Sequence, residues 1–331
     1  MGDETGRSLD PEQVSRILVA LQHDFGWEGN DSHFELIDSW GRPRSGSDFY
    51  RVAGNHSANE MVVKVVPDWT VGTAKKLYGN MVDLDDMISA ADLSTIHGVR
   101  PLAWSDEPPA LVMPYLPGDD VVSILRRPTD PAWTSGAMLD WMEWAGTMLA
   151  AYHLQTEAPT QDERASARRE AQNLAGKLRI KREAVDRLLA GIDDVGLTRR
   201  RFGDFGPGNL QGTPDGSLYL LDPPDTREVS LIHRDIANFI FELRRQLAGH
   251  GFTRYPPVKG RFEDFRRRFV SGYLKNWPGL DMGADDEALI ALFEANRAAG
   301  MAMKRFPGRL SDALWFGRLA LRRRRDVTRT G

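Results

Sequence analysis

The sequence contains no cysteine among its 331 residues. Disulfides, thiolate nucleophiles and cysteine-ligated zinc are therefore excluded, and a cytoplasmic enzyme is the expectation. The apolar runs fall far short of the roughly 20 residues that span a bilayer, and the first residues, Met1 to Glu4, are too polar for a signal peptide. Neither sign of charge dominates, since the net charge is -4. Binding to nucleic acid and stable membrane insertion are therefore not expected.

A chain of this length is expected to form about two domains or lobes. Residues 1–116 predict a β-rich lobe that carries one or two helices, and Pro117-Gly118 marks its end. Alternation and β-branched residues predict strands at 34–37, 49–52, 61–66, 99–104 and 110–114. Helical periodicity predicts helices at 11–25 and 73–91.

Residues 117–331 form the second expected lobe, which is mostly helical. Apolar residues recur at helical spacing in 138–154, and 162–191 is a charged helical stretch. Helical patterns resume at 235–247, 261–276, 285–303 and 311–325. Glycines and prolines interrupt this pattern at 202–222, where a short strand is predicted at 218–221.

The interruption carries the residues with the clearest chemistry. Asp204 and Asn209 stand five residues apart in a loop rich in glycine and proline, and Asp222 follows at the end of an apolar strand. Phosphoryl transfer needs a carboxylate beside the acceptor hydroxyl and oxygen ligands that hold Mg²⁺ against the phosphates. By themselves, however, Asp204 and Asn209 are also ordinary turn residues.

The segment from Asp204 to Asn209, followed by the strand before Asp222, resembles the catalytic loop of the aminoglycoside phosphotransferase and choline kinase superfamily. The resemblance implies that Asp204 is the catalytic base or positions the hydroxyl. It implies further that Asn209 and Asp222 are the metal ligands.

Further segments resemble the same family in the same order, over roughly residues 45–245. Ser45, Gly46 and Ser47 are similar to its nucleotide-covering loop, and Lys64 to its phosphate-binding lysine. Met113 and Tyr115 lie in a stretch that looks like the hinge for adenine. The helix that ends at His153 and the helix start at His233-Arg234-Asp235 complete the set, and Asp235 is expected to support the catalytic loop.

Each of these segments also has a simpler interpretation. Ser45-Gly46-Ser47 is a common turn sequence, and Lys64 can be a strand lysine that discourages aggregation. His153 is expected to be a packing histidine rather than a ligand.

The sequence also departs from the family pattern. Phe202 replaces the usual loop histidine, and Pro223-Pro224 follows Asp222. No glutamate in 73–91 is available to pair with Lys64, and three aspartates remain as alternatives: Asp83, Asp85 and Asp86.

The resemblance implies an α+β, bilobal protein-kinase-like fold with a small antiparallel sheet in the first lobe. The expected activity is transfer of the γ-phosphate of ATP, or GTP, to a hydroxyl of a sugar, aminoglycoside or amino-alcohol, with Mg²⁺. The alternative is a non-catalytic kinase-like nucleotide-binding module. A protein kinase is disfavoured because the Asp-Phe-Gly and Ala-Pro-Glu landmarks are missing. The basic run at 322–325 allows weak contact with a membrane surface.

Overall fold

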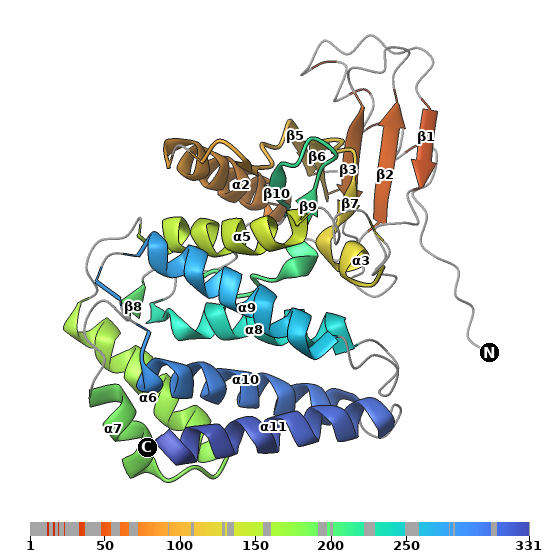
Figure 1. The fold of residues 1–331 in the computed structure, drawn as a ribbon. Helices are drawn as coiled ribbons and strands as arrows, with labels where there is room; N and C mark the ends of the chain where they lie inside the picture. Colours follow the sequence, from red (N-terminus) through yellow and green to blue (C-terminus); the bar gives the residue numbers. More distant parts are fainter. Residues whose placement is uncertain are drawn as a thin grey trace.

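The structure is a computed structural model (Figure 1). It describes residues 12, 16, 19, 23, 33–36, 48–53, 60–65, 72–91, 93–106, 109–127, 130, 136–154, 160–190, 197–198, 201–221, 229–248, 258–277, 279–280, 282–305 and 310–330. The four described residues of the predicted first helix, 12, 16, 19 and 23, are helical.

The N-terminal part contains a five-stranded antiparallel sheet in the order β1-β2-β3-β6-β5. Its strands are β1 (His33–Leu36), β2 (Asp48–Ala53), β3 (Met61–Val65), β5 (Ala103–Asp106) and β6 (Pro109–Pro114). Alternation along β3 sends Val63 to one apolar cluster and Val62 to another on the opposite face. The prediction of a small antiparallel sheet is confirmed.

One helix, α2 (Thr73–Ala90), packs beside this sheet (Figure 1). Its residue Met81 is 2% exposed and lies in the same cluster as Val62 and Leu111. The apolar residues of α2, which recur at helical spacing, therefore pack against the sheet, as the sequence predicts.

A second sheet joins the two halves of the chain, in the order β4-β10-β9-β7. Its strands are β4 (Ile96–Gly98), β7 (Asp119–Asp120), β9 (Leu210–Gly212) and β10 (Leu218–Leu220). β4 and β10 are parallel, with Ile96 opposite Leu218. The expected boundary at residue 116 stays a prediction, since this sheet takes strands from both sides of it.

The C-terminal part is mostly helical (Figure 1). Its helices are α3 (Val121–Leu125), α5 (Ala137–Leu154), α6 (Gln161–Lys177), α7 (Arg182–Ala190), α8 (His233–Ala248), α9 (Val258–Lys275), α10 (Ala284–Arg305) and α11 (Leu310–Thr330). A two-stranded sheet, β8 (Leu197–Thr198) and β11 (Ser230–Leu231), and a short 3₁₀ turn, η4 (Pro207–Asn209), complete it. No helix in the described part of the chain has the length and apolarity needed to cross a bilayer.

Two glycines let α5 and α9 approach closely. A Cβ added to Gly146 would lie 2.0 Å from the carbonyl oxygen of Phe269, and one added to Gly272 would lie 1.9 Å from that of Glu143. Any larger side chain would therefore push the helices apart. This contact fixes α9, which carries Phe269 and Tyr273 into the core.

Two predicted boundaries were wrong. The strand predicted at 99–104 begins at Ala103, because Pro101 has no N–H to donate to a ladder. The helical stretch predicted at 162–191 is two helices, α6 and α7, and between them Arg179 adopts a positive φ of 54°. A right-handed helix cannot continue through that conformation.

Candidate functional site

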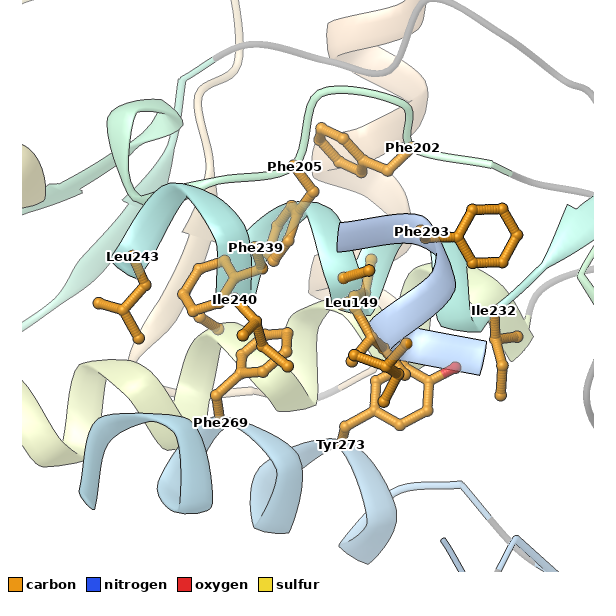
Figure 2. Close-up of a cluster of buried hydrophobic side chains, with 14 of the residues drawn as sticks. Leu149, Phe202, Phe205, Ile232, Phe239, Ile240, Leu243, Phe269, Tyr273 and Phe293 are labelled. Carbon is orange, nitrogen blue, oxygen red and sulfur yellow. The ribbon is translucent and has the colours of Figure 1, made fainter. Parts of the chain in front are cut away.

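The loop that contains Asp204 is held by two phenylalanines that flank it. Phe202 is 3% exposed and Phe205 is fully buried, and their ring centroids lie 4.9 Å apart. Phe205 packs near Phe239, which stacks on Phe269 at 4.0 Å (Figure 2). Burial of a phenylalanine contributes about 1.5–3 kcal/mol. Phe202, which replaces the usual histidine, thus anchors the loop by apolar packing.

The backbone of the loop is held by α8. The Asp235 carboxylate accepts the N–H groups of Phe202 at 2.6 Å and Gly203 at 3.0 Å. The Asn238 amide donates to the carbonyl of Gly203 at 2.6 Å. The expectation that Asp235 supports this loop is confirmed, and Asn238 adds a contact that the sequence did not reveal.

Asp235 is itself held by a buried hydrogen-bond chain. His153 Nε2 lies 3.1 Å from Asp235 Oδ2, and His153 Nδ1 lies 2.8 Å from the Tyr273 hydroxyl. Burial raises the pKa of Tyr273 well above its usual range, and the charge of Asp235 adds to this shift. A carboxylate accepts hydrogen bonds, so Nε2–H donates to Asp235, and in the neutral imidazole Nδ1 then accepts the hydrogen bond of the Tyr273 hydroxyl. His153 is a packing and hydrogen-bonding histidine, as predicted.

Asp204 and Asn209 lie at the two ends of one tight loop. The Asn209 side-chain nitrogen donates to the carbonyl of Asp204 at 2.9 Å. Because the nitrogen is used in this way, the amide oxygen is the atom of Asn209 suited to a cation. The Asp204 side chain is 76% exposed, whereas Asn209 is only 8% exposed. The carboxylate can therefore meet a solute from outside the core.

The strand that leads to Asp222 is tied to this loop. The N–H of Leu221 donates to the carbonyl of Asn209 at 2.8 Å. Leu221 also packs against the cluster that contains Val62 and Leu111 of the N-terminal sheet. Asp222 lies outside the described residues, as do Pro223-Pro224.

Lys64 lies on the face of the sheet that bears this cluster. It stands opposite Leu111 and Phe49 across the two neighbouring strands, and its Nζ lies 5.7 Å from the centre of the Phe49 ring. Residues directly opposite one another in a sheet share a face. The structure therefore brings Lys64 and Leu221 to the same cluster, which links the sheet to the loop.

Two of the three aspartates considered as partners of Lys64 have another contact. Arg100 binds Asp86 at 2.5 Å and Asp85 at 3.2 Å. Asp83 is exposed on the same helix, and a pairing of Lys64 with one of the three aspartates stays a prediction.

The predicted hinge runs out of β6. Met113 is 6% exposed and packs in the cluster below Lys64, and the N–H of Tyr115 donates to the carbonyl of Glu60 at 2.9 Å. Any adenine contact of Tyr115 would therefore use its ring or its carbonyl. The Gln211 side chain donates to the carbonyl of Leu116 at 2.7 Å, which fixes the hinge to β9. The third predicted nucleotide segment, Ser45, Gly46 and Ser47, lies outside the described residues.

The described member of the predicted metal-ligand pair, Asn209, suits magnesium. Asn209 offers an oriented amide oxygen, and hard cations prefer such oxygen ligands. In the part of the chain that the structure describes, no group of three or more His, Cys, Asp or Glu side chains forms a metal cluster. The ligand pair predicted from the sequence is an amide and a carboxylate, Asn209 and Asp222. Asp222 lies outside the described residues.

Sequence reasoning missed Arg297 of α10 and Glu242 of α8. One Arg297 nitrogen lies 3.0 Å from Asp204 Oδ1 and 3.0 Å from Glu242 Oε1. No motif marks Arg297, which lies 93 residues from Asp204. The one available signal was a lone arginine in the alanine-rich stretch of α10.

Three of the solved structures with the same architecture are small-molecule kinases. A spectinomycin phosphotransferase in complex with ADP and spectinomycin matches with a TM-score of 0.51 at 10% identity, covering 96% of this chain and 98% of that one. An amicoumacin kinase in complex with AMP-PNP and Ca²⁺ matches with a TM-score of 0.54 at 13% identity, covering 98% and 96%. A glucosamine kinase in complex with glucosamine, ADP and inorganic phosphate matches with a TM-score of 0.53 at 17% identity, covering 96% and 86%.

The chain shares the bilobal, protein-kinase-like fold of these three structures. No protein-family model matches the sequence, and the comparison with curated proteins gives no match either. At identities of 10–17%, the structural match shows a shared fold alone. A fold does not by itself assign an acceptor.

Proposed function

We propose that the chain is a small-molecule kinase that transfers the γ-phosphate of ATP or GTP to a hydroxyl of a sugar, aminoglycoside or amino-alcohol. The observation that carries the proposal is the loop from Asp204 to Asn209, clamped by Asp235 in a kinase-like fold. A loop held at so many points presents a carboxylate and an amide oxygen in fixed relation, as positioning catalysis requires.

Each residue has a proposed role. Lys64 binds the α- and β-phosphates, Ser45, Gly46 and Ser47 cover them, and Met113 and Tyr115 bound the adenine site. Asn209 and Asp222 would hold Mg²⁺, which when bound would neutralise the phosphate charge. The residue range 1–116 then forms the nucleotide lobe, and 117–331 forms the lobe with the catalytic loop.

Asp204 acts on the acceptor. Its exposed carboxylate accepts a hydrogen bond from the acceptor hydroxyl and takes its proton as the oxygen attacks the γ-phosphorus. A new phosphorus–oxygen bond forms, the bond from the γ-phosphorus to the bridging oxygen breaks, and the nucleoside diphosphate leaves. Most of the rate gain comes from alignment and from charge neutralisation.

A screen for ADP release tests the proposal, with Mg·ATP or Mg·GTP and a panel of hydroxyl compounds that includes spectinomycin, glucosamine and ethanolamine. Mass spectrometry should show an acceptor that has gained one phosphoryl group. Asp204→Asn should lower turnover by on the order of 10³ while nucleotide still binds, because a transition-state role affects kcat first. Asp285→Asn, which changes an exposed aspartate, is the control. Nucleotide binding without transfer or hydrolysis would favour the non-catalytic module instead.

A further inference from the structure

The exposed carboxylate of Asp204 is paired with a cation that comes from a distant helix. Arg297 projects from α10, and one of its terminal nitrogens, Nη2, lies 3.0 Å from Asp204 Oδ1. The loop from residue 202 to residue 209 contains no lysine or arginine. The positive charge beside Asp204 is therefore supplied from outside the loop.

Arg297 is anchored independently of Asp204. The same nitrogen contacts Glu242 Oε1 at 3.0 Å, the other terminal nitrogen lies 3.5 Å from Asn238 Oδ1, and the guanidinium lies 5.6 Å from the centre of the Phe241 ring. The Glu242 side chain is 15% exposed. Three groups of α8 thus hold the guanidinium in place independently of its contact with the loop.

The charge of Arg297 is secure at any working pH. Burial lowers the pKa of Arg297, but the nearby charges of Glu242 and Asp204 raise it by more, so its pKa lies above the usual range. The guanidinium thus remains a donor to Asp204 throughout.

The two partners of this ion pair differ in exposure and in their other contacts. The Arg297 side chain is 30% exposed and anchored, whereas the Asp204 side chain is 76% exposed. An exposed ion pair of this kind contributes little stability, typically about 0–1 kcal/mol. It can still restrict the rotamers of the exposed partner, because Arg297 has further contacts with α8.

We propose that Arg297 is a positioning residue for Asp204, holding Oδ1 so that Oδ2 faces the acceptor hydroxyl. Among the described residues, Oδ2 has no hydrogen-bond donor, whereas Oδ1 is taken by Arg297. Together with Asn209, which holds the backbone carbonyl of Asp204, this contact fixes both ends of the residue. The inference rests on the proposed kinase function.

The test compares variants of Arg297 in two backgrounds, with Asp204 intact and with Asp204→Asn. ADP release from Mg·ATP is measured with the best acceptor of the screen and with water alone. With Asp204 intact, Arg297→Gln should lower kcat by about 30-fold or more, with KM for Mg·ATP within about twofold, because a small misplacement of a catalytic group costs up to about 100-fold. Arg297→Lys should recover part of the loss. In the Asp204→Asn background, Arg297→Gln should change the residual rate by less than about twofold.

Arg245→Gln is the matched control, because Arg245 also binds Glu242 but does not contact Asp204. Equal losses from Arg297→Gln in both backgrounds, or the same loss from Arg245→Gln, would overturn the positioning role while the kinase function stands. If Arg297→Gln does not fold, Arg297→Lys in the two backgrounds decides by the same criterion. A wild-type protein that neither transfers phosphate nor hydrolyses ATP would overturn the kinase function and this inference with it.

Discussion

The carboxylate of Asp235 lies 2.6 Å from the backbone nitrogen of Phe202, although 33 residues separate them in the chain. Its second oxygen accepts the N–H of Gly203 at 3.0 Å. One side chain at the start of α8 therefore fixes the backbone on which Asp204 stands. The side chain is buried, so both bonds form away from competing water.

Replacing this carboxylate should weaken both the fold and the site. Asp235→Asn leaves one oxygen for two backbone donors and brings an NH₂ group against them, so the free energy of unfolding should fall by about 2–4 kcal/mol. Turnover of any acceptor should fall by about 10- to 100-fold through loss of alignment. Denaturant unfolding and ADP release measure the two effects. Asp285→Asn removes a charge from the first turn of α10 and should lower the free energy of unfolding by less than about 1 kcal/mol without changing turnover. An unaffected Asp235→Asn protein would show that the loop is held by other contacts.

Much of the fold could be predicted from the sequence because its elements are strongly periodic. The helices from α8 to α11 begin and end within five residues of the prediction, since amphipathic spacing persists over many turns. The short strands β4, β7 and β9 were missed, because two or three residues carry no readable period. Their pairing depends on partners far away in the chain.

Only part of the candidate site could likewise be predicted from the sequence. Asp204, Asn209 and Lys64 were predicted as site residues because they stand in ordered motifs, and Asp235 was predicted as a support of the loop because a helix starts there. Arg297 could not be found, because it reaches Asp204 only through the packing of α10 against α8. The contact is a product of tertiary structure, and local sequence does not encode it.

The close approach of α5 and α9 makes a second prediction. Gly146→Ala would place a methyl group 2.0 Å from the Phe269 carbonyl oxygen and 2.7 Å from the Tyr273 nitrogen, both of them backbone atoms. The helices must separate, which should lower the free energy of unfolding by about 1–3 kcal/mol. Gly300→Ala, in the open middle of α10, should instead stabilise the protein by up to about 1 kcal/mol. Thermal unfolding of both variants gives the comparison, and a Gly146→Ala protein as stable as Gly300→Ala would refute the contact.

A third prediction concerns acid. Asp286 Oδ1 lies 2.7 Å from His233 Nε2, and Oδ2 accepts the N–H of Gly283 at 2.9 Å. Burial raises the pKa of Asp286, but the contacts with His233 and Gly283 lower it by more, so the net shift is downward. A lowered pKa stabilises the fold above the unfolded value of about 3.9, and this contribution is lost as pH falls through the folded value.

Urea unfolding between pH 3 and pH 6 measures this contribution. The stability difference between the wild type and Asp286→Asn should be largest above about pH 4.5 and should shrink steadily below about pH 4. Asp312→Asn, in the first turn of α11, serves as the comparison for a general effect of removing one acidic group. A difference that stays constant down to pH 3 would mean that the Asp286 contacts do not favour its ionised form.

Binding of Mg·ATP, followed by thermal unfolding, tests most directly whether the chain holds a metal-bound nucleotide. At about 100 times the dissociation constant, binding should add about 2.7 kcal/mol, which corresponds to a rise in Tm of several degrees. The rise should require Mg²⁺ and ATP together, should disappear in Asp222→Ala, should be reduced in Lys64→Ala and should persist in Asp285→Asn. A wild-type Tm that Mg·ATP and Mg·GTP both leave unchanged, or an Asp222→Ala protein stabilised as much as the wild type, would contradict the proposed site.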